Sequence, residues 1–184
     1  LIADMNGDGY DDVIAVDTDT ISGLNEWYIH YSVPGSNPFP TDDSTVSTDA
    51  TFSFGLNATH VPQVGDINGD GRADVISVDD DGTNFDWYIS NAATGESPFP
   101  NNTTTVLSID TTFNDYGANN DVPVVGDWDN DGDDNIGVVD ENTSPSTWPT
   151  PCLRIPLRAS RPKSTNFPSP SNLWRDINAF TNGW

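Results

Sequence analysis

Three stretches of the chain place oxygen-bearing side chains at the same spacing. Loop one (residues 4–12), loop two (66–74) and loop three (127–135) each carry them at positions one, three, five and nine. Alternate positions on a tight turn can bring their oxygens to one point, and Ca²⁺ prefers about six to eight oxygen ligands. The candidate ligands are Asp4, Asn6, Asp8 and Asp12 in loop one; Asp66, Asn68, Asp70 and Asp74 in loop two; and Asp127, Asp129, Asp131 and Asn135 in loop three.

The other positions of the loops suit a tight turn. Position six is glycine in every copy, which permits backbone angles that other residues resist. Position four is Gly7, Gly69 and Asn130, residue types that tolerate positive φ. One copy would be weak evidence, but three copies at matching positions predict three calcium loops.

The flanking residues exclude an EF-hand. An EF-hand requires a bidentate Glu at position twelve and a helix on each side. Position twelve is Ala15, Ser77 and Val138 here. The β-branched runs that follow each loop predict strands, and the short apolar segments 61–65 and 122–126 predict strands before loops two and three. Each loop should therefore join two strands.

The loops belong to a repeat of constant length. Asp4 precedes Asp66 by 62 residues, and Asp66 precedes Asp127 by 61. Two further landmarks recur with that period: Trp27-Tyr28-Ile29 with Trp87-Tyr88-Ile89, and Pro38-Phe39-Pro40 with Pro98-Phe99-Pro100. Each unit ends in a Thr-rich strand, predicted at 44–54 and 103–113. Four short antiparallel strands per unit predict an all-β fold of β-propeller blades, with a β-sandwich as the competing architecture.

The repeats predict the organisation of the chain. We expect residues 1–60 to be a blade that lacks part of its first strand, 61–121 to be a complete blade, and 122–148 to begin a third. Residues 149–184 are an off-pattern tail rich in Pro, Ser and Arg, which we expect to be disordered or translated out of frame. About two and a half blades are too few to close a ring, so an incomplete propeller fragment is expected, completed by blades of the same parent chain.

Charge narrows the range of partners. The chain has a formal charge of −23, and residues 1–148 contain 28 of its 29 acidic residues with a single basic residue, Arg72. Such a segment repels phosphate, which argues against nucleic acid as a partner. No stretch is long and apolar enough to insert into a membrane. The one cysteine, Cys152, lies in the tail, so disulfides do not stabilise the repeats.

Residues suited to catalysis are scarce. His30 and His60 are the only histidines, and no Ser/His/Asp or Cys/His arrangement is apparent, so we expect no enzyme. The repeated tryptophans Trp27 and Trp87 could stack on sugars, but recurrence at one position of every unit favours packing between blades. Their neighbours Tyr28 and Tyr88 are predicted on the opposite face.

At these residues the chain resembles the FG-GAP/VCBS repeat family, which includes the N-terminal repeats of integrin α subunits. The resemblance covers residues 1–148 and rests on Gly-Asp-x-Asn-Gly-Asp-Gly-x-x-Asp at 65–74 and its two counterparts. It implies one Ca²⁺ per loop, up to three ions, held between two strands of a blade. It also implies a backbone carbonyl ligand at position seven, which is Tyr10, Arg72 or Asp133. Asn135 replaces the closing Asp of the family, and Asp129 restores the charge of loop three.

The resemblance implies a calcium-binding segment of a secreted or cell-surface protein that serves as a binding or adhesion scaffold. Its ligand would be a protein or a carbohydrate. Two alternatives remain open: a carbohydrate-binding propeller lectin, and a non-catalytic module attached to a secreted hydrolase or toxin. Residues 1–184 contain no signal peptide, and a targeting segment could have been lost upstream of residue 1.

Overall fold

The computed structural model of the chain describes residues 1–19, 23–33, 35, 48–56, 60–95, 97–140 and 152–154. These residues form β-strands and no helix, so no helix among them could cross a membrane. The strands are β1 (Ile2–Ala3), β2 (Asp12–Asp19), β3 (Leu24–His30), β4 (Ala50–Leu56), β5 (His60–Gly65), β6 (Asp74–Asp80), β7 (Phe85–Ser90), β8 (Asn101–Val106), β9 (Thr111–Phe113), β10 (Val122–Gly126), β11 (Asn135–Asp140) and β12 (Cys152–Arg154).

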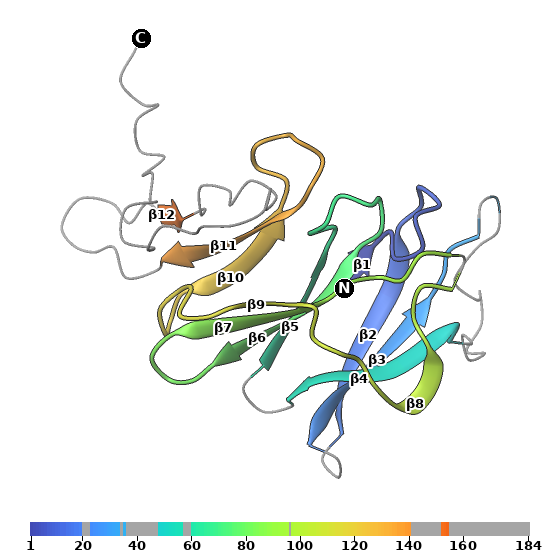
Figure 1. Ribbon diagram of the computed structural model, residues 1–184, viewed down its shortest axis with the longest axis horizontal. Helices are drawn as coiled ribbons and strands as arrows, with labels where there is room; N and C mark the ends of the chain where they lie inside the picture. Colours follow the sequence, from blue (N-terminus) through green and yellow to red (C-terminus); the bar gives the residue numbers. More distant parts are fainter. Residues whose placement is uncertain are drawn as a thin grey trace.

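The strands form three sheets that stand side by side and do not close into a barrel (Figure 1). The strand order is β1-β2-β3-β4-β8 in the first sheet, β5-β6-β7-β9 in the second and β10-β11-β12 in the third. Each sheet begins with the antiparallel pair of strands that flanks one acidic loop. The predicted all-β, propeller-like arrangement of strand, loop and strand is therefore confirmed.

The repeated tryptophans occupy matching places in the first two sheets. Trp27 lies opposite Val16 on β2, and Trp87 lies opposite Val78 on β6. Both tryptophans are fully buried. The indole N–H of Trp27 donates to the carbonyl of Phe54 at 2.9 Å, and that of Trp87 donates to the carbonyl of Tyr116 at 2.8 Å. The prediction that these residues are core is confirmed.

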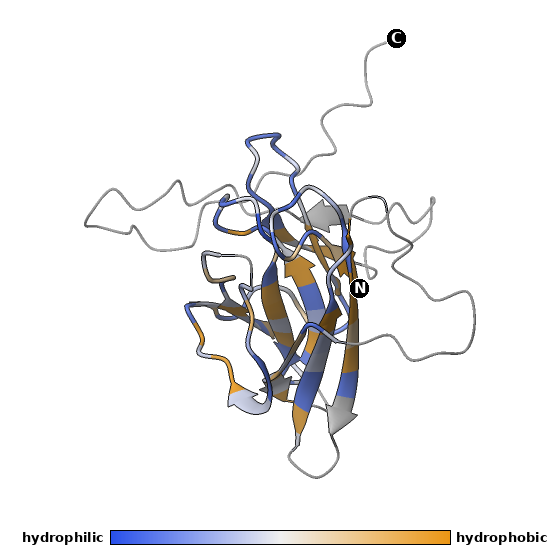
Figure 2. Ribbon diagram, turned by 90° about the vertical axis from the view of Figure 1, so that its right-hand side faces the viewer, coloured by the Kyte–Doolittle hydropathy of each residue, from blue (hydrophilic) through white to orange (hydrophobic). Residues whose placement is uncertain are grey.

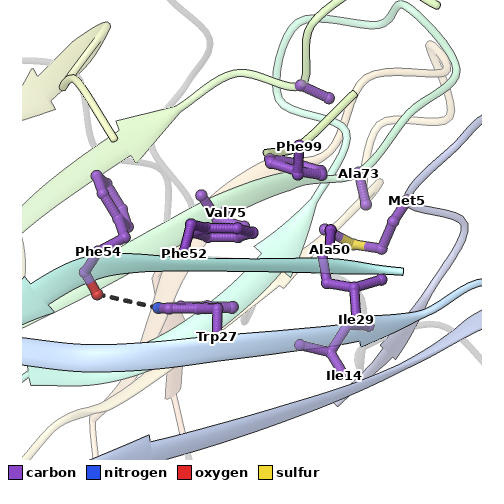
Figure 3. Packing of buried hydrophobic residues seen from close by; sticks show 11 residues of the cluster. Met5, Ile14, Trp27, Ile29, Ala50, Phe52, Phe54, Ala73, Val75 and Phe99 are labelled. Atoms are coloured by element: carbon purple, nitrogen blue, oxygen red, sulfur yellow. Dashed lines mark hydrogen bonds between the residues drawn. The ribbon is translucent and has the colours of Figure 1, made fainter. Parts of the chain in front are cut away.

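Two apolar clusters join the sheets. The first lies between the first and second sheets and centres on Trp27, Phe52 and Val75 (Figure 3). The second lies between the second and third sheets and includes Ile76 and Ile136. Successive side chains of β6 point to opposite faces, so both of its faces are buried. Elsewhere, hydrophobic residues alternate with hydrophilic ones along several strands, and the loops are mainly hydrophilic (Figure 2).

The predicted Thr-rich strand at 103–113 is wrong, because this segment forms parts of two strands in different sheets. β8 pairs in parallel with β4 of the first sheet, whereas β9 pairs antiparallel with β7 of the second. Phe99 packs into the first cluster, so the residues that follow it lie along the edge of the first sheet and pair with β4. The counterpart predicted at 44–54 begins later, since β4 starts at Ala50.

A short strand completes the description of the third sheet. β12 pairs antiparallel with β11, on the edge opposite β10. Val139 lies opposite Leu153, as its counterpart Val78 lies opposite Trp87. Residues 152–154 fall within the segment predicted to be off-pattern. The rest of that segment, together with Trp148 and Pro38-Phe39-Pro40, lies outside the described residues.

Candidate metal centres

The three loops share one backbone conformation. Position four has φ of 78° at Gly7, 70° at Gly69 and 57° at Asn130. Position six also has positive φ, with 84° at Gly71 and 95° at Gly132. Glycine and asparagine adopt this region most readily. The turn predicted from residue types is therefore confirmed in every copy.

The first carboxylate of each loop organises the turn behind it. Asp4 accepts hydrogen bonds from the backbone N–H groups of Gly7 at 2.7 Å, Asp8 at 3.1 Å and Gly9 at 2.7 Å. Asp66 accepts them from Asp70 at 3.0 Å and Gly71 at 2.7 Å, and Asp127 from Asp131 at 3.3 Å and Gly132 at 3.1 Å. The same interaction in all three copies holds each loop in one shape.

The fifth-position carboxylate contacts the residue predicted to supply a carbonyl ligand. The backbone N–H of Tyr10 donates to Asp8 at 2.9 Å. Matching bonds join Arg72 to Asp70 at 3.0 Å and Asp133 to Asp131 at 3.1 Å. These bonds fix the peptide plane at position seven.

The ninth-position carboxylates of loops one and two are buried and tie each loop to its sheet. Asp12 accepts backbone hydrogen bonds from Met5 at 2.9 Å and from Ser32, just beyond β3, at 2.7 Å. Asp74 accepts the matching bonds from Ile67 at 3.0 Å and from Ala92, just beyond β7, at 2.9 Å. Both side chains are fully buried. These bonds fix the position of loop one relative to β3 and that of loop two relative to β7.

Asn135 holds loop three less firmly. It accepts a single described hydrogen bond, from the backbone N–H of Trp128 at 3.3 Å. An amide has one acceptor oxygen where a carboxylate has two. This difference agrees with the expectation that the ninth position of loop three departs from the other two.

Burial and neighbouring charge act against the ionised form of Asp74. Desolvation raises its pKa to about 7, and the charges of Asp66 and Asp70 act in the same direction. Hydrogen bonds from Ala92 and Ile67 oppose the shift. Desolvation likewise raises the pKa of Asp12, with Asp8 and Asp4 adding to the effect. A cation among these carboxylates would favour their charged forms.

Loop three brings three carboxylates together. One oxygen from each of Asp127, Asp129 and Asp131 lies within 4.8 Å of the other two, and all three residues are exposed. Loops one and two have an asparagine at position three. The amide nitrogen of Asn6 donates to Asp8 at 3.2 Å, and that of Asn68 lies 3.3 Å from an oxygen of Asp74. All three donor sets consist of oxygen groups suited to a hard divalent cation.

Adjacent loops are in direct contact, which the spacing of the ligands did not predict. Asp134 donates its backbone N–H to the carbonyl of Asp66 at 2.6 Å, and its carboxylate accepts the N–H of Asp66 at 2.8 Å. Burial raises the pKa of Asp134, and the charges of Asp66 and Asp127 add to the shift. The signal for this contact in the sequence is the acidic residue at position eight of loop three, a position that is also acidic in loop one, at Asp11.

Away from the loops, the structure groups Ser77, His60 and Asp79, a Ser/His/Asp arrangement that was not apparent from the sequence. His60 Nδ1 lies 2.6 Å from Ser77 Oγ. His60 Nε2 lies 3.4 Å from Asp79 Oδ1, with geometry that does not make a hydrogen bond. Ser77 is 1% exposed and packs against Gly55 of β4. A substrate cannot reach this hydroxyl, so the group is a packing contact between the first two sheets.

Comparison with known proteins supports the repeat. The family model described as FG-GAP-like repeat matches residues 4–77, a span that contains all of loops one and two. The resemblance deduced from the loop residues is confirmed over this span. No curated protein and no solved structure matches the chain.

Proposed function

From the FG-GAP-like repeat at residues 4–77, we propose that this chain is a calcium-binding β-propeller segment of a secreted or cell-surface protein, serving as a binding or adhesion scaffold. The observation that carries the proposal is the triple occurrence of one loop geometry. The first carboxylate orders the turn in all three copies, and the ninth ties loops one and two to their sheets. Such loops place oxygen ligands at fixed points on a rigid frame.

The proposed ligands are those at positions one, three, five, seven and nine. In loop three, Asp127, Asp129 and Asp131 would supply three carboxylates from the exposed surface. In loops one and two, the buried Asp12 and Asp74 would close the site from the sheet side. A bound divalent cation would neutralise these clustered carboxylates. Since it would bind the folded loop alone, it would stabilise the fold by mass action.

The proposed location and the proposed class of partner rest on calcium availability, on net charge and on the burial of the tryptophans. Extracellular calcium is abundant enough to load modest sites, which favours a secreted or surface protein. The strong negative charge argues against nucleic acid as a partner. Trp27 and Trp87 are buried and cannot stack on a sugar, which weighs against a lectin acting through them. The scaffold is proposed to act without catalysis of its own, since such repeats are generally non-catalytic modules.

A calcium titration of the full chain tests the proposal. The chain is treated with chelator, and calcium binding is followed by calorimetry, with two or three sites expected. The part of the tryptophan-sensitised terbium luminescence that Trp128→Phe removes would report loop three, because Trp128 is the second residue of that loop. Asp129→Ala, which removes the side-chain oxygens at position three, should greatly reduce the terbium signal. Asp115→Asn is the control, because it removes an exposed carboxylate outside the loops at a φ of 57° that asparagine tolerates.

Two outcomes would count against the proposal. Absence of binding heat in millimolar calcium would reject a metal role for the loops. Terbium luminescence that is unchanged by Asp129→Ala would show that the ion binds elsewhere. Binding of the calcium-loaded chain to a glycan array would support the lectin alternative instead of a protein-binding scaffold.

A further inference from the structure

The outer edge of the first sheet is covered by a strand from the next repeat. β8 runs parallel to β4, and three hydrogen bonds fasten the two segments. Thr51 donates its N–H to the carbonyl of Pro100 at 2.9 Å, and Leu107 donates its N–H to the carbonyl of Ser53 at 3.0 Å. The hydroxyl of Ser53 donates to the carbonyl of Thr103 at 3.3 Å. The segment that starts at Pro98-Phe99-Pro100 thus acts as an added strand.

A phenylalanine anchors this added strand. Phe99 is 4% exposed and stacks on Phe52 with ring centroids 5.2 Å apart. Phe52 in turn stacks on Trp27 at 6.1 Å and is fully buried (Figure 3). The flanking prolines hold the segment extended before it docks, which lowers the entropy lost on pairing.

The second sheet has the same edge in β9. Asp49, just before β4, accepts the N–H of Tyr31 at 2.9 Å, and Asp110, just before β9, accepts that of Asn91 at 2.8 Å. The N–H of Asp49 donates to Ile29 and that of Asp110 to Ile89, each at 2.8 Å.

After Asp49 and Asp110, β4 and β9 pair with the preceding strand of their sheets in the same register. Phe52 lies opposite Trp27, and Phe113 lies opposite Trp87. Phe113 is therefore the counterpart of Phe52, yet it is 38% exposed. β9 is the last strand of its sheet among the described residues, so its outer backbone groups face no strand there.

We propose that the outer edge of β9, with Phe113 at its centre, is a docking site for residues 38–46 of a second copy of this chain. These residues carry Pro38-Phe39-Pro40 followed by Val46, the spacing of Pro98-Phe99-Pro100 and Val106 in the segment that covers β4. Phe39 would stack on Phe113 as Phe99 stacks on Phe52. The following residues would pair in parallel with β9, which is recognition by strand addition.

The contact joins different surfaces of the two copies. A head-to-tail contact of this kind does not saturate at a dimer unless it closes a ring, so it builds chains of copies. Asp42 and Asp43 stand where the β4-covering segment has Asn102 and Thr103. Because both copies are acidic, salt should strengthen the association by screening repulsion. The proposal does not depend on calcium and goes beyond the proposed function.

Sedimentation of the full chain tests the proposal. The mass of the wild type should rise with concentration, and rise further with added salt. Phe39→Ala and Phe113→Ala should each weaken association about tenfold, the loss of one anchoring residue. A mixture of the two variants should restore association but stop at dimers, since each variant keeps one of the two surfaces. A peptide spanning residues 97–108 should compete.

The folding of each variant is checked separately. Near-ultraviolet circular dichroism of the buried tryptophans should match that of the wild type, and Phe39→Ala changes a residue outside the described core. A wild type that stays monomeric at every concentration and salt would overturn the proposal. Association that both variants retain would overturn it as well, and would assign self-association to another surface. Peptide binding by the Phe113→Ala chain equal to that of the wild type would exclude β9 as the docking edge.

Discussion

Ala73 donates its backbone N–H to the carbonyl oxygen of Asp4 at 2.8 Å, linking loop two to loop one. Asp134 makes the same bond to Asp66 at 2.6 Å, linking loop three to loop two. In both pairs the eighth residue of one loop holds the first residue of the preceding loop. The first residue also orders its own turn through its carboxylate. Ordering of one loop should therefore stabilise the ordered conformation of the next loop.

Cation binding at adjacent loops should be coupled. Asp70→Asn replaces a carboxylate ligand of loop two with a neutral amide and leaves the residues of loop three unchanged. We expect it to weaken terbium binding at loop three about fivefold, a typical coupling between sites. The terbium luminescence that Trp128→Phe removes measures that affinity. Asp8→Asn in loop one is the matched control, because loop one has no described bond to loop three, and a smaller effect is expected. Equal effects of both substitutions would contradict coupling through the bond between Asp66 and Asp134.

Gly69→Ala should destabilise the chain more than Gly71→Ala. Both residues have positive φ, 70° and 84°, so each alanine brings backbone strain of about 1 kcal/mol. A Cβ on Gly69 would in addition overlap the carboxylate of Asp133, whereas one on Gly71 would meet nothing. Urea unfolding of both variants measures the difference. Equal losses of unfolding free energy in the two variants would show that Asp133 moves away from a Cβ at residue 69 without a loss of stability.

Trp87→Phe should lower the free energy of unfolding by about 1–3 kcal/mol. The substitution removes the indole N–H and leaves the carbonyl of Tyr116 without its 2.8 Å donor in a buried place. Trp128→Phe is the control, since Trp128 is only half-buried. Chemical unfolding followed by circular dichroism gives both values. A loss no larger at Trp87 than at Trp128 would contradict the structural role of this bond.

Without calcium, Asp74 should make the fold less stable as pH rises from 3.8 to about 7. Burial raises its pKa from 3.8 to about 7, so the folded chain binds more protons than the unfolded chain in this window. The free energy of unfolding therefore falls with rising pH. Unfolding in chelator at several pH values measures this contribution. Added calcium should remove most of the loss at pH 7, because it stabilises the folded, charged loop.

His60 contributes with the opposite sign and must be separated. Burial lowers its pKa, so the unfolded chain binds a proton near pH 6.5 that the folded chain does not. Its contribution to stability is lost as pH falls below that value. The measurement is therefore made on His60→Gln as well. If the His60→Gln chain loses the same stability between pH 4 and 7 with and without Asp74→Asn, the assignment to Asp74 is wrong.

The acidic loops, the strands around them and the buried tryptophans could be predicted because short segments determine them. The conformation of the turn at residues 66–74 depends on the positive φ of Gly69 and Gly71 and on the carboxylate of Asp66. All three residues lie within nine positions of the sequence. Alternation of apolar residues then places Trp87 in the core whatever lies beyond it. The match to the FG-GAP-like repeat extends over residues 4–77, which contain two copies of this motif.

Other features were decided only when the sheets packed together. β8 pairs with the first sheet and not with the sheet of its own repeat, because Phe99 is buried against Phe52. The sequence of residues 98–106 alone does not show which sheet edge the segment will join. Asp134 bridges to Asp66, and His60 meets Ser77, across 68 and 17 residues of sequence. Backbone angles and side-chain alternation are local, so the sequence by itself determined the loops and the strand pattern. Edge pairing and contacts between loops depend on which surfaces compete for one another in space, and only the tertiary structure could decide them.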